Sequence, residues 1–69
     1  MREVAHPKHY TSGKIEVWDF IVDQGLNFCR GNIVKYVCRA GRKDPNAELT
    51  DLKKAKAYIE REIRALEEA

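Results

Sequence analysis

The stretch that decides the fold is 31-GNIVKYVCRAGRK-43, which has the pattern of a helix that ends at a glycine. Its apolar residues recur at helical spacing and form one side of that helix: Ile33, Val34, Val37 and Cys38. Asn27 is a suitable N-cap and Gly41 a suitable C′ residue. We therefore predict a helix from about Phe28 to Arg39 or Ala40.

The same helix carries a polar stripe. Asn32, Lys35 and Arg39 fall at i, i+3 and i+7, and Arg42 and Lys43 follow just past the end of the helix. Residues 28–43 hold two lysines, three arginines and no acid, a charge of +5 in a chain whose net charge is only +2. Such a local block favours a small anion, whereas a binder of long nucleic acid usually has a much more basic surface. A solvent-exposed flank is the alternative.

Two further helices flank this one. The apolar spacing of residues 15–22 predicts a helix from about Lys14 to Gln24, with Trp18 as a core anchor. Asp44 followed by Pro45 predicts a third helix from about Pro45 or Asn46 to Leu66. The apolar stripe of the third helix is Leu49, Leu52, Ala55, Ile59, Ile63 and Leu66. The expected fold is a single all-α domain over residues 1–69, with an extended arm at 1–13 and three helices within 14–69.

The third helix repeats the polar pattern of the second. Asp51, Lys54 and Tyr58 lie at i, i+3 and i+7, beside its apolar stripe. The arm adds His9 and Tyr10, which could close over a site. A solvated flank and tyrosines at the edge of the core are the alternatives for these residues.

Several classes of protein are disfavoured by the composition. Cys29 and Cys38 are nine residues apart in one predicted helix, roughly 13 Å along its axis, which is too far for a disulfide. No His or Cys spacing resembles a zinc site, and no P-loop or GxGxxG motif is present. Neither a signal peptide nor a membrane span is visible, so a cytoplasmic protein without membrane contact is expected.

The size of the chain predicts a homo-oligomer. A core built from 69 residues supplies roughly 3–5 kcal/mol, and small domains without disulfides or metals commonly gain stability by self-association. A single short helix would also cover only part of a ligand, so we expect the site to lie at or near a subunit interface.

The chain resembles a family of small domains of unknown function that is common in bacteriophage genomes. The pattern is P-x-H-Y, then I-E, then F-x-x-G-N-x-x-K-Y-x-x-R-A-G-x-K, then D-L-x-K-A-x-x-Y. It is matched here by Pro7, His9, Tyr10, Ile15, Glu16, Phe28, Gly31, Asn32, Lys35, Tyr36, Arg39, Ala40, Gly41, Lys43, Asp51, Leu52, Lys54, Ala55 and Tyr58.

A similar segment forms the C-terminal part of a phage nucleotide kinase that acts on deoxynucleoside monophosphates and lacks a P-loop. The present chain lacks the long N-terminal region of that kinase. The resemblance implies a nucleotide site made by His9, Tyr10, Asn32, Lys35, Arg39, Lys43, Lys54 and Tyr58.

Three functions are compatible with these features. The first is a phage protein that captures a small phosphorylated nucleotide, as a sponge for a nucleotide signal of bacterial anti-phage defence, in the host cytoplasm and without a cofactor. The second is a nucleoside monophosphate kinase, which would use ATP, with Asp51 or His9 orienting the acceptor. The third is a helical adaptor for a host protein. The catalytic residues of a kinase and the identity of the nucleotide do not follow from the sequence.

Overall fold

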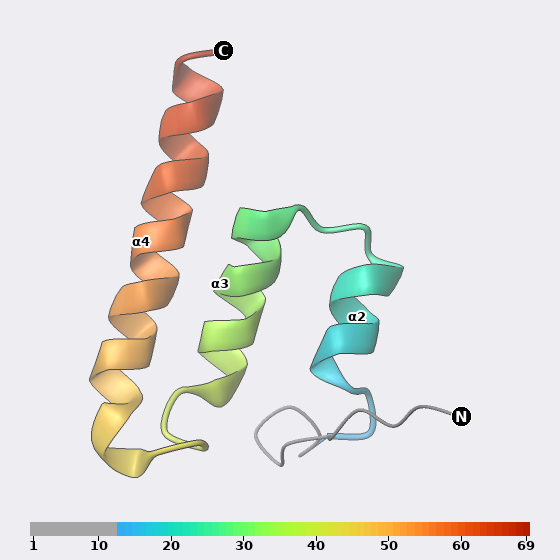
Figure 1. Ribbon diagram of the computed structural model, residues 1–69, viewed down its shortest axis with the longest axis vertical. Coiled ribbons are helices and arrows are strands. Elements are labelled where there is room, and N and C mark those ends of the chain that lie inside the picture. Colours follow the sequence, from blue (N-terminus) through green and yellow to red (C-terminus); the bar gives the residue numbers. More distant parts are fainter. Residues whose placement is uncertain (1–12) are drawn as a thin grey trace.

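The computed structural model describes residues 13–69 and contains three α-helices within that range. They are α2 (Val17–Asp23), α3 (Phe28–Arg39) and α4 (Glu48–Glu67), and a 3₁₀ turn, η1 (Pro45–Ala47), leads into α4. The helices lie side by side with α3 in the middle, and the C-terminal part of α4 extends well beyond the start of α3 (Figure 1). The predicted all-α fold of three helices is confirmed, and no strand occurs among residues 13–69.

The predicted ends of α3 are confirmed. At its start, the side chain of Asn27 accepts a hydrogen bond of 2.8 Å from the backbone amide of Arg30, as an N-cap does. Just after its end, Gly41 has a φ of 77°, in the left-handed region that only glycine adopts without strain. These two residues fix where the cation-bearing helix begins and ends.

The other two helices start later than predicted. The first begins at Val17 instead of Lys14, because Glu16 is extended (φ −69°, ψ 136°) and leaves the residues before it outside the helix. The third is preceded by η1, because the side chain of Asp44 caps the backbone amide of Asn46 at 2.9 Å and closes a tight turn around Pro45. At its far end, α4 continues to Glu67, one residue past the prediction.

The core lies between α3 and α4, and Ala55 is the one residue of the predicted α4 stripe that is buried in it. Within residues 13–69 the buried residues are Gly31, Asp51 and Ala55. The five large apolar residues of the stripe stay between 41% and 65% exposed: Leu49, Leu52, Ile59, Ile63 and Leu66. Trp18 is 38% exposed, so its expected role as a core anchor is also wrong within this chain.

Helix geometry explains the discrepancy. α3 contacts α4 along the line of Asp51, Ala55 and Glu62, which lies about a quarter turn around the helix from the centre of the apolar stripe. The apolar stripe is therefore displaced from the partner helix, and only Ala55, at its edge, is buried.

The contact between α2 and α3 is close at one point. A Cβ atom on Gly31 would lie 3.0 Å from Cγ2 of Ile21, so the absence of a side chain at residue 31 lets the two helices approach. In residues 13–69, no helix combines the length and the apolar character that crossing a membrane requires.

Candidate functional site

Three cationic side chains surround the ring of Tyr36. The Nζ atom of Lys35 lies 5.2 Å from the ring centroid, Cζ of Arg39 lies 4.8 Å from it, and Nζ of Lys54 lies 5.4 Å from it. All three distances are within the range of cation–π attraction. Lys35 and Arg39 come from α3 and Lys54 from α4, so the packing of the two helices assembles the group. We call these residues, together with Asp51, the Tyr36 cluster.

Asp51 is the carboxylate of the cluster. Its Oδ1 accepts a hydrogen bond of 3.1 Å from Nε of Arg39, and the two side chains are only 2% and 16% exposed. Arg39 lies in the last turn of α3 and Asp51 in the first turn of α4, where the helix dipoles favour a cation and an anion respectively. The fold therefore provides a suitable place for each charge.

The charges of the cluster do not balance. Three cations and one carboxylate leave a local charge of +2 in these four side chains. In addition, Oδ2 of Asp51 is buried and has no hydrogen-bond partner within residues 13–69. Buried polar atoms in folded proteins nearly always have a partner, so an unsatisfied one calls for an explanation. The excess positive charge suits an anionic ligand, whereas the buried Oδ2 atom is not accessible to one in this packing.

An aromatic series runs beside the charges. The rings of Tyr36 and Tyr58 are stacked, with centroids 5.9 Å apart and planes at 15°. Phe28 meets Tyr58 edge to face at 6.0 Å and 72°. Such pairs contribute roughly 0.5–1.5 kcal/mol each beyond the burial of their area. Tyr58 therefore has a packing role between α3 and α4, whether or not it also contacts a ligand.

The predicted polar stripe of α3 is divided between two places. Asn32 donates a hydrogen bond of 2.9 Å to the backbone carbonyl of Phe28 in the preceding turn. Asn32 and Lys35 line a groove of about 290 Å³ between α2 and α3, whose other lining residues are Ile21, Leu26, Asn27, Phe28 and Gly31. Arg39 does not line this groove. Lys35 thus belongs both to the groove and to the Tyr36 cluster.

Three predicted site residues remain, and the structure describes one of them, Lys43. Lys43 is exposed in the turn after α3. His9 and Tyr10 lie outside the described residues, so their placement at the site stays a prediction. Tyr36 was missed as a site residue, although its position between Lys35 and Arg39 in the K-Y-x-x-R motif was a signal for it.

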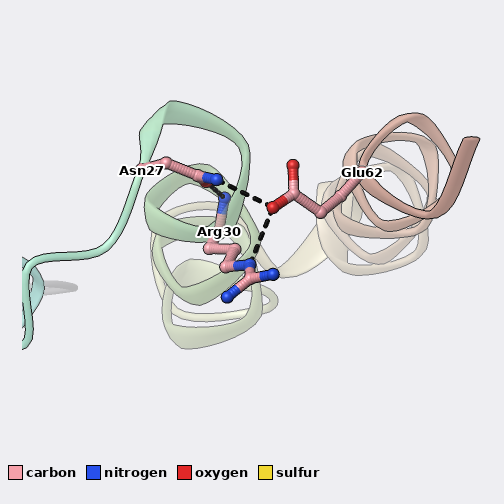
Figure 2. A network of polar contacts seen from close by, with 3 residues as sticks. All are labelled: Asn27, Arg30 and Glu62. Atoms are coloured by element: carbon pink, nitrogen blue, oxygen red, sulfur yellow. Dashed lines mark hydrogen bonds and ion pairs between the residues drawn. The ribbon is translucent and has the colours of Figure 1, made fainter. Parts of the chain in front are cut away.

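A second polar network fastens the other end of α3. Figure 2 shows Oε2 of Glu62 accepting hydrogen bonds of 2.7 Å from Nδ2 of Asn27 and of 2.7 Å from Nε of Arg30. The bond from Asn27 lowers the pKa of Glu62, the bond and charge of Arg30 act in the same direction, and desolvation opposes them. No sequence signal links these residues, because Glu62 is 32 positions after Arg30. The network is structural: it holds the start of α3 to the second half of α4.

Two features of the described residues concern metal ions and disulfides. Residues 13–69 contain no group of three or more His, Cys, Asp or Glu side chains that could hold a metal ion. Cys29 and Cys38 are both free thiols, each partly exposed.

The described residues form a small helical domain in which charged and aromatic side chains meet between α3 and α4. The chain belongs to the family of proteins of unknown function DUF3310, whose model matches residues 4–60. It is similar to the Gene 1.7 protein of Enterobacteria phage T3, with 40% identity over 65 residues. That similarity covers 84% of this chain and 40% of the phage T3 protein, so the chain spans well under half the length of that relative. No solved structure matches the chain.

Proposed function

We propose that the protein binds a small phosphorylated nucleotide at the Tyr36 cluster and holds it without changing it. The observation that carries the proposal is the convergence of Lys35, Arg39 and Lys54 on one ring, beside the carboxylate of Asp51. Like charges brought together in this way repel one another, and a bound phosphate group would neutralise the excess.

The three cations suit different parts of a phosphate group. Lys35 and Lys54 carry compact charges on long side chains, whereas the guanidinium of Arg39 is planar and is oriented by its bond to Asp51. The groove between α2 and α3 continues from Lys35 and is lined by Ile21, Leu26 and Phe28. A nucleotide could place its phosphates at the cluster and its base in this apolar groove.

The biological role that we propose is supported by the similarity to a phage protein. DUF3310 is matched over most of the chain, and the similar protein named above comes from a phage. A small phage protein that holds a nucleotide tightly would act as a sponge for a nucleotide signal of the host's anti-phage defence. This role requires the binding site proposed above. It further proposes that the nucleotide bound there is a signal of the host's defence.

Phosphoryl transfer is the second candidate, and the same three cations favour it. Lys35, Arg39 and Lys54 would neutralise the charge of the transferred group. The same residues therefore serve either function, and only turnover distinguishes them.

The experiment starts from the purified protein. Small molecules released by heating are identified by mass spectrometry, and a panel of nucleoside monophosphates, ATP, cyclic dinucleotides and ADP-ribose is titrated by calorimetry. Lys35→Gln and Lys54→Gln should each weaken binding at least tenfold, the effect of losing one charge-assisted contact of about 1.4 kcal/mol.

The matched control is Arg61→Gln, which removes one positive charge from an exposed position of the same helix and should leave binding unchanged. An equal effect of all three substitutions would show that only the overall charge matters. Conversion of a monophosphate in the presence of ATP would establish the kinase. Absence of any bound nucleotide, with co-purification of a host protein, would favour the adaptor.

A further inference from the structure

The exposed side of α4 carries the spacing of a coiled coil. Six positions alternate at intervals of three and four residues: Leu49, Leu52, Lys56, Ile59, Ile63 and Leu66. These are the a and d positions of a heptad repeat, beginning with Leu49 at a, and we call them the α4 seam. Its five apolar members remain 41–65% exposed because α3 packs on a different side of α4.

We infer that a second copy of this chain covers the α4 seam, with the two α4 helices antiparallel. In that arrangement each a residue meets a d residue of the other copy. With the two helices centred on one another, Leu49 lies opposite Leu66 and Leu52 lies opposite Ile63. By the two-fold symmetry of such a pair each layer occurs twice, so all five apolar residues gain a partner.

In the antiparallel orientation, charged residues beside the seam of one copy face residues of opposite charge in the other copy. The residues on its open flank, at the e positions, are Lys53, Glu60 and Glu67. In an antiparallel pair e positions face e positions, so Lys53 of each copy lies near Glu60 of the other. The opposite flank is already occupied by α3, which holds Glu62 through Asn27 and Arg30. A second copy of this chain therefore supplies the charge partners of Lys53 and Glu60.

A parallel pair would conflict with the same residues. Lys56 would then lie directly opposite Lys56 in the middle of the interface, and Glu62 would face Glu67. In the antiparallel pair Lys56 meets Ile59 instead, where its aliphatic part can pack while its ammonium group extends to solvent. A single polar residue at an a position commonly selects the orientation of a coiled coil in this way.

The seam and the Tyr36 cluster occupy different sides of α4. Lys54 and Tyr58 project more than a quarter turn away from the line of Leu52 and Ile59. Pairing through the seam therefore leaves the cluster uncovered, and the inference stands or falls independently of nucleotide binding.

The mass in solution is the first test. Sedimentation equilibrium at tens of micromolar should give about twice the chain mass of 8.0 kDa. Ile59→Lys should convert the protein to monomer with its helical far-UV spectrum retained, because Ile59 is 41% exposed within the single chain. Ala57→Lys, at an exposed position away from the seam, is the matched control and should leave the dimer intact. A wild-type mass of one chain would overturn the inference.

A charge exchange tests the orientation without introducing a polar residue into the seam. Lys53→Glu should weaken dimerisation about tenfold, because two symmetry-related pairs are lost together. The double variant Lys53→Glu/Glu60→Lys should restore it, since the pairs are then reversed. In a parallel pair the double variant would place the new carboxylate at position 53 against Glu48 of the other copy, and dimerisation would not recover.

Cross-linking gives a direct reading of the same geometry. In a Cys29→Ser/Cys38→Ser background, Leu49→Cys and Leu66→Cys chains are mixed and oxidised. Disulfides should form between the two kinds of chain. Disulfides that join Leu49→Cys chains to one another instead would show a parallel pair and would overturn the inference.

Discussion

At the scale of single residues, the buried ion pair of Arg39 and Asp51 is the feature that should tolerate substitution least. Removing two charges from water is costly, and the mutual attraction offsets this cost only while both partners are present. Asp51 is almost completely inaccessible and already has one oxygen without a hydrogen bond. The charged form of Asp51 therefore needs its partner Arg39 more than a carboxylate in an exposed ion pair needs its own partner.

Substituting Arg39 by alanine should destabilise the fold strongly. Loss of one member of a buried pair typically costs about 3–5 kcal/mol, because the other charge is left without a partner. Urea unfolding followed by far-UV circular dichroism measures the change, with Lys35→Ala as the control that removes a cation from the same cluster. An Arg39→Ala variant as stable as Lys35→Ala would contradict the expected role of the pair.

The buried pair of Arg39 and Asp51 also affects how nucleotide binding by an Arg39 variant must be measured. Because Arg39→Ala would impair folding as well as binding, its effect on affinity alone is hard to interpret. Arg39→Met/Asp51→Leu removes both charges together and should recover much of the lost stability while still failing to bind nucleotide. Comparing the two variants separates the structural role of Arg39 from its role toward a phosphate.

Glu62 gives the fold an acid-sensitive contact. Its pKa is lowered from the usual 4.5, mainly by the hydrogen bond from Asn27. A carboxyl group whose pKa is lower in the folded state stabilises the fold above its unfolded pKa. That contribution is lost as the pH falls below about 4.5 and through the folded pKa.

Glu62→Gln should therefore lower the melting temperature at pH 7 but have a smaller effect at pH 3. The control is Glu68→Gln, whose side chain is exposed after the end of α4. A pH profile of Glu62→Gln that stays parallel to that of the wild-type protein would contradict the assignment.

Much of the candidate site was predictable from the sequence at this scale. Lys35, Arg39, Lys54 and Tyr58 were selected from two helical stripes, and the structure brings them together. Tyr36 was missed because helical periodicity cannot show which side chain will lie at the centre of a contact between two helices. Whether the group binds a nucleotide stays a prediction.

At the scale of elements, local signals were reliable and tertiary ones were not. The bounds of α3 were predictable because Asn27 and Gly41 act within one turn of the helix ends. The burial of α4 was not, because an apolar stripe shows that a helix has a side to cover but not which neighbour covers it. α3 instead uses the line of Asp51, Ala55 and Glu62, which mixes two charges with one small residue.

The turn that ends α3 can be tested by one substitution, at Gly41. Its φ of 77° is unfavourable for any residue with a Cβ, and a Cβ there would also lie 3.1 Å from Cδ of Glu48. Gly41→Ala should cost about 1–2 kcal/mol of unfolding free energy. Gly13→Ala, where no atom lies within 4 Å of the added Cβ, is the control and should be close to neutral. Equal stabilities of the two variants would argue against the left-handed turn.

At the scale of the whole molecule, three helices in one layer bury few of their residues (Figure 1). A layer has two broad sides and edges, and in this chain α4 presents the Tyr36 cluster and the α4 seam in different directions. One surface suits an anion and the other suits a second apolar helix. Both would add stability that the small core does not supply.

This separation leads to a prediction about thermal stability. Binding of any partner to the folded state alone raises the melting temperature by mass action, and a ligand at one hundred times its dissociation constant adds about 2.7 kcal/mol. The wild-type melting temperature should therefore rise with protein concentration, through the seam, and rise again with the nucleotide identified by mass spectrometry, through the cluster. The rise with protein concentration should persist without nucleotide, and the rise with nucleotide should persist when dimerisation is prevented.

Two variants should separate the effect of protein concentration on the melting temperature from the effect of nucleotide. Ile59→Lys should lose the dependence on protein concentration and keep the response to nucleotide, whereas Lys54→Gln should do the opposite. Differential scanning fluorimetry over a hundredfold range of protein concentration, with and without nucleotide, measures both. If Ile59→Lys abolished the nucleotide response while remaining folded, the site would need residues from both copies. That result would place the binding site at the subunit interface and would contradict the independence of the two surfaces on α4.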